Sequence, residues 1–358
     1  MTAKLLEGLR VLDLSLWQPG HYATQLLADL GADVIKVEPP GGDRMRPMID
    51  RFANFNGRKS STVLNLKNDA DRATLLRMVE DAEVVVEGYR PGVLTRLGIG
   101  FDQLRAVNPA IVLCSISGFG QDGPLSTATG HDANYQAYAG AMTVRDSLEP
   151  VPSALLIADQ GSGMAAAFGI LAAVLCARRT GEGEHIDVSM TDLLASWVAP
   201  LGPVDPNREA SGTKAAHEGG APAMGIFATA DERWVVLGVF TEDHFWDALC
   251  QSLLLDEYVG LNTSQRAERE GELRRQVAAA IASHTQDELL ALLGSRSVPI
   301  APVLTKEQML EHPHFRERGL LTIGSDGFLT LGHPIRYRLH PALLPGPPPE
   351  LVGRVDAS

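Results

Sequence analysis

Cysteine is scarce in this chain, whose 358 residues include only Cys114, Cys176 and Cys250. The three lie far apart and lack the spacing of metal ligands, which excludes a disulfide-stapled scaffold and a zinc module. They are typical of reduced thiols in a cytosolic protein. Because the first residues also lack a signal-peptide pattern, we expect a cytoplasmic location and no resident metal.

Net positive charge and long apolar runs are missing as well. The sequence contains 44 acidic and 31 basic side chains, a formal charge of −13. This balance argues against nucleic acid or an anionic membrane surface as the main partner. The most apolar stretch, residues 164–177, is shorter than the roughly 20 residues that cross a bilayer. We expect it to form a buried helix, and we expect no membrane partner.

The residues that are present follow an α/β rhythm. Apolar strands at 10–14 and 33–38 flank a turn at 17–20 and a helix at 21–30, and this order predicts a parallel βαβ unit. Further strands are expected at 83–87, 110–116, 153–158 and 184–190, with helices at 69–81, after Asp159 and at 192–198. The sequence therefore predicts an α/β fold with a parallel sheet.

The composition changes near Pro200. Residues 201–224 are rich in Gly, Pro and Ala and predict a linker. A smaller region follows, with two strands flanking 230–233 and several helices between 243 and 293. We expect a last strand at 298–303 to return toward the first domain.

Two loops carry residues suited to chemistry at a carbonyl compound. Asp159 lies between an apolar strand and an apolar helix, and His131 lies 28 positions earlier in a glycine-flanked loop. A carboxylate and an imidazole can together perform acid/base or covalent catalysis. Two simpler interpretations stay open, because Asp159 could only cap the following helix and His131 could be an ordinary loop residue.

Glycines near these loops match a dinucleotide fingerprint by letter. The first match, residues 118–123, is followed by Pro124 instead of a helix. The second includes Gly161 and Gly163 and lies on a late strand–helix turn, whereas the fingerprint belongs on the first. A dehydrogenase is therefore disfavoured, and the later glycines could instead let a ligand approach the backbone beside Asp159.

Basic residues gather near the carboxyl ends of predicted strands in the first half of the chain. Ligands of open parallel sheets bind at that edge. As a group in an acidic protein, these residues fit a ligand with several phosphates, such as coenzyme A. They are Lys36, Arg44, Arg46, Lys59, Lys67 and Arg90.

Five segments of the chain resemble the family III CoA-transferases and the α-methylacyl-CoA racemases, which share one fold. The matching segments are residues 6–14, 26–38, 89–93, 115–124 and 179–183. The resemblance implies a large Rossmann-like domain from 1–200 and 305–358 and a small α+β domain over 225–304. It also implies an interlocked homodimer with the active site at the interface.

The resemblance assigns a role to each of the two loops. Asp159 matches the aspartate that attacks the thioester in the transferases and that is one of two acid/base groups in the racemases. The second racemase group is the histidine of a Gly-His-Asp-x-Asn-Tyr motif, present here at 130–135. Typical transferases carry an aromatic residue where His131 stands. Backbone N–H groups around Gly161 and Gly163 could stabilise the enolate oxygen.

Other positions match family segments that hold CoA or complete the site. The usual Leu-Asp-Leu-Lys of the family is Leu-Asn-Leu-Lys at 64–67, and the racemases' small-domain glutamate matches Glu242 with a one-residue shift. The racemases' tyrosine near Met224 is absent. The residues implied to bind CoA are Lys36, Leu64, Asn65, Leu66, Lys67, Arg90, Gly130, Asp132, Asn134 and Tyr135.

The sequence therefore predicts a racemase of 2-methyl-branched fatty acyl-CoA thioesters, with His131, Asp159 and Glu242 as catalytic residues. The alternative is a CoA-transferase that moves CoA between carboxylic acids through an aspartyl-CoA thioester on Asp159. A non-catalytic CoA-ester-binding protein is disfavoured, because both reactive side chains are retained. The expected partners are the acyl-CoA and a second copy of the chain, and no cofactor is expected beyond the CoA moiety of the substrate.

Overall fold

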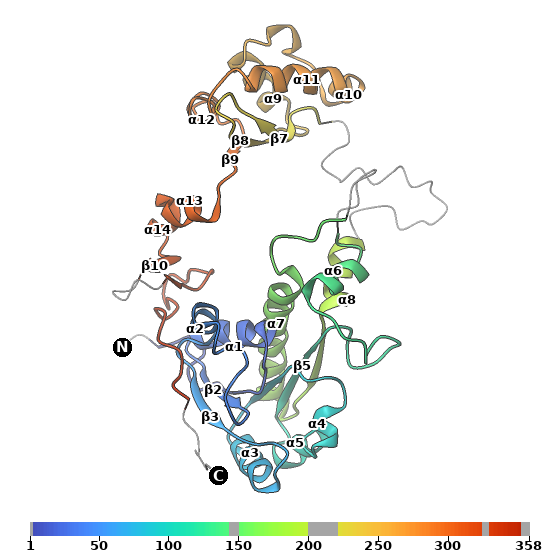
Figure 1. Cartoon of the computed structure of the whole chain (residues 1–358), viewed down its shortest axis with the longest axis vertical. Helices are drawn as coiled ribbons and strands as arrows, with labels where there is room; N and C mark the ends of the chain where they lie inside the picture. The colour runs from blue at the N-terminus through green and yellow to red at the C-terminus, as the bar shows by residue number, and fades with distance from the viewer. Residues whose placement is uncertain (1–2, 143–149, 200–220, 324–328, 352–358) are drawn as a thin grey trace. The chain divides into compact units, whose positions relative to one another are not determined.

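The computed structural model describes residues 3–142, 150–199, 221–323 and 329–351 (Figure 1). Two compact units divide the chain, the first from Met1–Ala199 and Pro313–Ser358, the second from Pro200–His312. The return to the large domain therefore falls after the expected position 305, because helix α13 (Lys306–Glu311) groups with the second unit. Of the expected linker at 201–224, residues 201–220 lie outside the described residues. Strand β7 begins at Met224, the last residue of that range.

A six-stranded parallel sheet organises the first unit. Its strand order is β3-β2-β1-β4-β5-β6, and all neighbouring strands run parallel, which confirms the predicted α/β class. In doubly wound sheets of this order, ligands bind beyond the carboxyl ends of the strands where the order reverses, here at β1 and β4. The strands are β1 (Arg10–Asp13), β2 (Asp33–Glu38), β3 (Ser60–Val63), β4 (Val84–Glu87), β5 (Val112–Ser117) and β6 (His185–Ser189).

Local sequence accounts for most of these elements. β2 spans the predicted 33–38, and the core strands β4 and β5 bury every residue. β3 is not predicted by the sequence, because Ser-Ser-Thr-Val offers a single strongly apolar side chain to an edge strand. Helix α1 begins at Gln18 rather than after a turn, because the ring of Pro19 is compatible with the first helical turn.

Helices pack on both faces of the sheet. One core lies between the sheet, α1 and α7, and the other lies between the opposite face and the helices around α3 and α5. The helices of the first unit are α1 (Gln18–Asp29), α2 (Ile49–Asn56), α3 (Asp69–Glu80), α4 (Val93–Arg96), α5 (Phe101–Val107), α6 (Asp132–Tyr138), α7 (Ile157–Thr180), α8 (Met190–Val198) and α14 (Pro313–Glu317), with a hairpin of β10 (Leu321–Ile323) and β11 (Leu329–Leu331).

Helix α7 differs from its prediction at both ends. The predicted strand at 153–158 does not form, since the helix already begins at Ile157 and Leu155 is 64% exposed. With 24 residues, α7 is long and apolar enough to cross a membrane by length and composition. The helix is therefore longer than the apolar stretch 164–177 that was predicted from the sequence. Core helices of soluble proteins meet the same criterion. In α7, 39% of the most apolar 18-residue window is buried within the protein.

The second unit is a small α+β body with its own core. Strand β9 pairs antiparallel with β8 in a three-stranded sheet, so the prediction that 298–303 returns to the first domain is wrong. Trp246, Leu249 and Leu273 lie at the centre of its core. Its elements are β7 (Met224–Ala228), β8 (Trp234–Gly238), α9 (Asp243–Ser252), the 3₁₀ helix η2 (Asp256–Tyr258), α10 (Thr263–Glu268), α11 (Glu270–Ile281), α12 (Gln286–Gly294), β9 (Ile300–Pro302) and α13.

Candidate active site

A cavity of about 750 Å³ opens at the carboxyl edge of the parallel sheet. The loops after β1, β4 and β5 form its base, which places it at the switch point where doubly wound sheets bind ligands. The loop before α6, the start of α7 and part of α2 complete the wall. All lining residues belong to the first unit.

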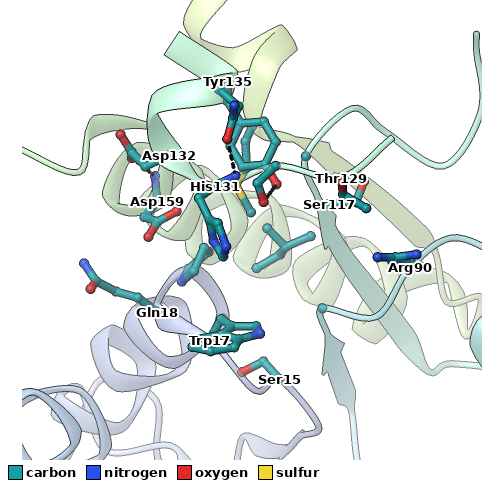
Figure 2. A pocket seen from close by; sticks show the side chains of 18 of the residues that line it. Ser15, Trp17, Gln18, Arg90, Ser117, Thr129, His131, Asp132, Tyr135 and Asp159 are labelled. Carbon is teal, nitrogen blue, oxygen red and sulfur yellow. Dashed lines mark hydrogen bonds between the residues drawn. The ribbon is translucent and has the colours of Figure 1, made fainter. Parts of the chain in front are cut away.

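Two of the three predicted catalytic side chains, His131 and Asp159, line this cavity. His131 is the N-cap residue of α6, and Asp159 is the third residue of α7. Figure 2 shows the imidazole and the carboxylate directed toward the same space. The structure thus brings together two residues that are 28 positions apart in the chain, as the two-loop hypothesis requires.

Asp132 connects the two loops. Its buried carboxylate accepts hydrogen bonds from the backbone N–H groups of Ala158 at 2.8 Å and Asp159 at 3.0 Å. Its other oxygen accepts from Gln136, which in turn accepts from the N–H of Ser153. Asp132 therefore caps α7 from another helix, and the interpretation of Asp159 as the cap is wrong. Asp132 also lines the cavity, so its contact with CoA stays a prediction beside this positioning role.

The same arrangement changes the acidity of Asp159. Burial, followed by the negative charge of Asp132, raises the pKa of Asp159 to about 7, while the charge of Arg51 opposes the shift. A carboxyl group that titrates near neutrality can both give and take a proton. Such displaced values cluster at functional sites.

The other residues of the 130–135 motif fix the shape of the loop. Asn134 Oδ1 accepts the backbone N–H of His131 at 2.9 Å. The hydroxyl of Tyr135 donates to the carbonyl of Gly130 at 2.6 Å. A Cβ atom at Gly130 would lie 2.9 Å from the Tyr135 ring, so a side chain is disfavoured there. All of these residues line the cavity, and their contacts in the structure orient His131.

Gly161 and Gly163 are not free to stabilise an oxyanion. Both lie within α7, where a Cβ atom would come within 2.6 Å of Trp197 and 2.7 Å of the Pro19 carbonyl, respectively. These glycines allow neighbouring segments to pack closely against α7. Unused donors occur instead at the start of α1, where Gln18 and Gly20 line the cavity and their backbone N–H groups have no acceptor among the described residues.

The residues predicted to bind CoA are divided by the structure. Arg90 is exposed, lines the cavity and has no ion-pair partner in the described part of the chain. Leu64 and Leu66 pack in the core. Asn65 donates its backbone N–H to Asp71 of α3 and accepts the N–H of Lys67, whose side chain is exposed outside the cavity. The 64–67 segment therefore does not join the cavity wall.

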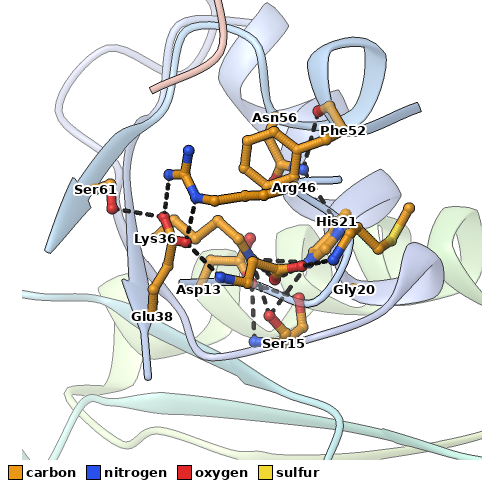
Figure 3. A network of polar contacts seen from close by, with 12 residues as sticks. Asp13, Ser15, Gly20, His21, Lys36, Glu38, Arg46, Phe52, Asn56 and Ser61 are labelled. Atoms are coloured by element: carbon orange, nitrogen blue, oxygen red, sulfur yellow. Dashed lines mark hydrogen bonds and ion pairs between the residues drawn. The ribbon is translucent and has the colours of Figure 1, made fainter. Parts of the chain in front are cut away.

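Lys36 belongs to a buried polar network that includes Ser15 of the loop between β1 and α1 and His21 of α1 (Figure 3). Its ammonium is fully buried, donates to the Ser15 carbonyl at 2.9 Å and pairs with Asp43 at 2.9 Å. It also lies 2.7 Å from His21 Nε2, and burial together with the charge of Lys36 lowers the pKa of His21 to about 4. Lys36 thus fixes the backbone of the cavity wall, which corrects its predicted contact with CoA.

Asp13 and Lys59 extend this network. Lys59 Nζ donates to Asp13 at 3.0 Å and to Asn56 at 2.8 Å, and burial lowers the pKa of Lys59 to about 8. Burial acts to raise the pKa of Asp13, but the charges of Lys36 and Lys59 lower it below its usual range. This network is not predicted from the sequence, although its signal is visible there as Asp13 and Lys36 within two otherwise largely apolar strands.

Ser117 lines the cavity, whereas the predicted catalytic residue Glu242 does not. Ser117, also missed, is buried at the end of β5 and lines the cavity, and its hydroxyl has no hydrogen-bond partner in the described residues. Glu242 lies in the second unit before α9 and is not part of the cavity wall. Its carboxylate accepts the N–H of Phe240, and backbone N–H groups lower the pKa of Glu242. Across the described residues, no three His, Cys, Asp or Glu side chains gather as metal ligands.

A Rossmann-like sheet with a cavity at its switch point and two reactive side chains in that cavity defines an α/β enzyme. Residues 6–354 match CoA-transferase family III, and the chain belongs to this family. The resemblance noted from the sequence is therefore confirmed.

Relatives in this family carry different activities in their names. The chain is 34% identical over 362 residues to the succinyl-CoA:mesaconate CoA-transferase of Haloarcula hispanica, covering 92% of this chain and 89% of that protein. It is 32% identical over 332 residues to the alpha-methylacyl-CoA racemase of Homo sapiens, covering 88% and 81%. Its fold is similar to the crystal structure of Rv3272 from Mycobacterium tuberculosis, with a TM-score of 0.89, 29% identity and coverage of 98% and 97%.

Proposed function

We propose that this enzyme racemises 2-methyl-branched acyl-CoA thioesters by two-base proton transfer. The observation that carries the proposal is the pairing of His131 and Asp159 on one cavity, with the pKa of Asp159 raised to about 7. Inversion at a carbon acid needs one group to remove the α-proton from one face and another group to deliver a proton to the opposite face. A transferase needs only the carboxylate.

In the proposed reaction, one of the two groups is protonated and the other is not. When His131 removes the α-proton, the C–H electron pair forms an enolate whose charge lies on the thioester oxygen. The protonated Asp159 then delivers its proton to the other face of the α-carbon, and the two groups exchange roles in the reverse direction. N–H groups of Gln18 and Gly20 at the start of α1 are suited to the enolate oxygen, because both residues line the cavity and these groups have no acceptor among the described residues.

The alternative is a CoA-transferase in which Asp159 is the nucleophile. The name of the Haloarcula hispanica relative favours it, as does that of the acetyl-CoA:oxalate CoA-transferase of Acetobacter aceti, 32% identical over 357 residues. In that reaction Asp159 would attack the thioester carbonyl, forming a mixed anhydride and releasing CoA as thiolate. The thiolate would then attack the Asp159 carbonyl carbon, break the anhydride, release the donor acid and leave the aspartyl-CoA thioester. His131 has no required part in these steps.

Proton exchange in D₂O separates the two functions. The protein is incubated with a 2-methylacyl-CoA of one configuration, and the α-proton is followed by NMR. We expect exchange with inversion in the wild type and none in His131→Ala. Absence of exchange in the wild type, together with transfer of CoA to an added acid that persists in His131→Ala, would overturn the racemase in favour of the transferase.

We also propose that the enzyme acts as a homodimer, needs no cofactor beyond the CoA of its substrate and is cytoplasmic. The dimer is supported by apolar side chains that α7 and α8 leave uncovered, since Phe168 is 76% exposed and Trp197 is 50% exposed. A monomer rarely leaves a large apolar patch in water. Light scattering on the purified protein should give twice the mass of the 38.4 kDa chain, and a monomeric mass would contradict the dimer.

A further inference from the structure

Arg51 is a cavity residue for which the sequence provided no role. It lies on α2, is exposed and lines the same cavity as His131 and Asp159. It makes no hydrogen bond or ion pair with any residue that the structure describes. Its guanidinium carries a fixed positive charge and five donors that match a carboxylate or a phosphate.

The position of Arg51 is set by the buried side of α2. The neighbouring Phe52 is buried, and the guanidinium of Arg46 lies 4.6 Å above its ring. Asn54 Nδ2 donates to the carbonyl of Asp50 within the same helix and to the carbonyl of Leu329 in β11, which anchors the helix. These contacts hold the short helix in place, while the side chain of Arg51 is exposed at the cavity.

Arg51 lies near Asp159 without contacting it. The positive charge of Arg51 lowers the pKa of Asp159 against the larger effect of burial, so the two groups interact electrostatically. No ion pair joins them, although both line the cavity. An anionic group that enters the cavity can therefore pair with the guanidinium.

The second unpaired arginine of the cavity lies elsewhere. Arg90 follows β4, and Figure 2 shows it on the side of the cavity away from Asp159. The phosphates of an acyl-CoA lie at one end of the molecule, and its acyl group lies at the other. When the thioester reaches Asp159, the phosphates account for a cation remote from Asp159 but not for Arg51.

We propose that Arg51 binds a second carboxylate on the acyl group, so that the preferred substrates are CoA monothioesters of dicarboxylic acids rather than plain fatty acyl-CoA esters. The inference rests on the proposed function, because it assumes that the thioester carbon lies at His131 and Asp159. Met45 and Met48 line the cavity from the same segment as Arg51. They would contact the carbon chain between the two carboxyl groups.

Two thioesters that differ only at the far end of the acyl chain test this subsite by binding. In 2-methylglutaryl-CoA, with the thioester beside the methyl branch, C5 is a carboxylate, and in 2-methylpentanoyl-CoA it is a methyl group. Calorimetry on the full chain should show about tenfold tighter binding of the carboxylate ester, as one charge-assisted hydrogen bond provides. The preference should fall to about one in Arg51→Met and be partly restored in Arg51→Lys. Equal binding of both esters by the wild type, or a preference that survives in Arg51→Met, would overturn the proposal.

Arg90→Met is the matched control, since it removes a guanidinium from the same cavity. It should weaken the binding of both esters and leave their ratio near the wild-type value. Proton exchange with the same esters then tests the reaction independently of the subsite. A tenfold preference in binding without exchange of either α-proton would refute the racemase and leave the Arg51 subsite intact. Exchange of both α-protons without any preference in binding would support the racemase and refute the Arg51 subsite.

Discussion

Replacing Asp159 by Asn should remove the activity and stabilise the protein at alkaline pH. Burial and the charge of Asp132 raise the pKa of Asp159 from 3.8 to about 7. Between these pH values the folded protein holds a proton that the unfolded chain has released. The stability of the wild type therefore falls as pH rises from about 4 through about 7, because the unfolded state binds fewer protons there. The neutral amide of Asn carries no such penalty.

The size of the effect follows from the shift. One pKa unit corresponds to about 1.4 kcal/mol, so the change from 3.8 to about 7 gives an upper limit of about 4 kcal/mol. Asp159 lines an open cavity and is only half-buried, and water screens part of the interaction. We therefore expect Asp159→Asn to be more stable than the wild type by about 1–2 kcal/mol at pH 8. The difference should be close to zero near pH 4.

Urea unfolding at pH 5 and pH 8 measures this difference. Asp192→Asn is the matched control, because Asp192 is an exposed carboxylate in the first turn of α8 in the same unit. That variant should show no gain in stability at pH 8, since it loses only a favourable interaction with the helix N-terminus. Exchange of the α-proton in D₂O should be undetectable in Asp159→Asn.

Two outcomes would refute this account of Asp159. A variant less stable than the wild type at pH 8 would mean that the ionised carboxylate is stabilised in the folded protein. A gain of the same size at pH 5 and pH 8 would mean that the Asn side chain packs better for reasons unrelated to the proton.

Two further predictions concern the packing around α7. Asp132→Ala should destabilise the protein by about 1–2 kcal/mol through loss of the α7 cap, and it should move the Asp159-dependent limb of the pH–rate profile to lower pH because a like charge is removed; an unmoved limb would contradict the coupling. Gly163→Ala should cost about 1–3 kcal/mol in thermal unfolding, because its Cβ would lie 2.7 Å from the Pro19 carbonyl. Gly169→Ala in the same helix, where the nearest atom is 3.4 Å away, is the control and should be neutral or stabilising.

The candidate site was predictable as a set of residues but not as an arrangement. His131 and Asp159 each stand out in their loops, and both reach the cavity. The sequence places Gly161 and Gly163 beside a ligand, yet the structure places them against neighbouring side chains and backbone. Glycine is compatible with either role, and only the neighbouring segments decide between them.

Lys36 and Arg51 show the same limit from opposite directions. Both are basic residues near the carboxyl edge of the sheet, and only Lys36 matched a segment expected to hold CoA. In the fold, Lys36 is fully buried beside Asp43, whereas Arg51 faces the cavity unpaired within the described residues. Burial of a charge depends on partners from distant segments, which a local pattern does not reveal.

The sequence by itself determined the α/β class, the core strands β2, β4 and β5, and the membership in CoA-transferase family III. These depend on apolar periodicity and on local motifs, and both are properties of contiguous residues. Only the tertiary structure decided that Asp132 caps α7 from another helix, and that burial together with the charge of Asp132 raises the pKa of Asp159. That interaction joins residues 27 positions apart, and its strength depends on the low polarity of a site that exists only after the chain has folded.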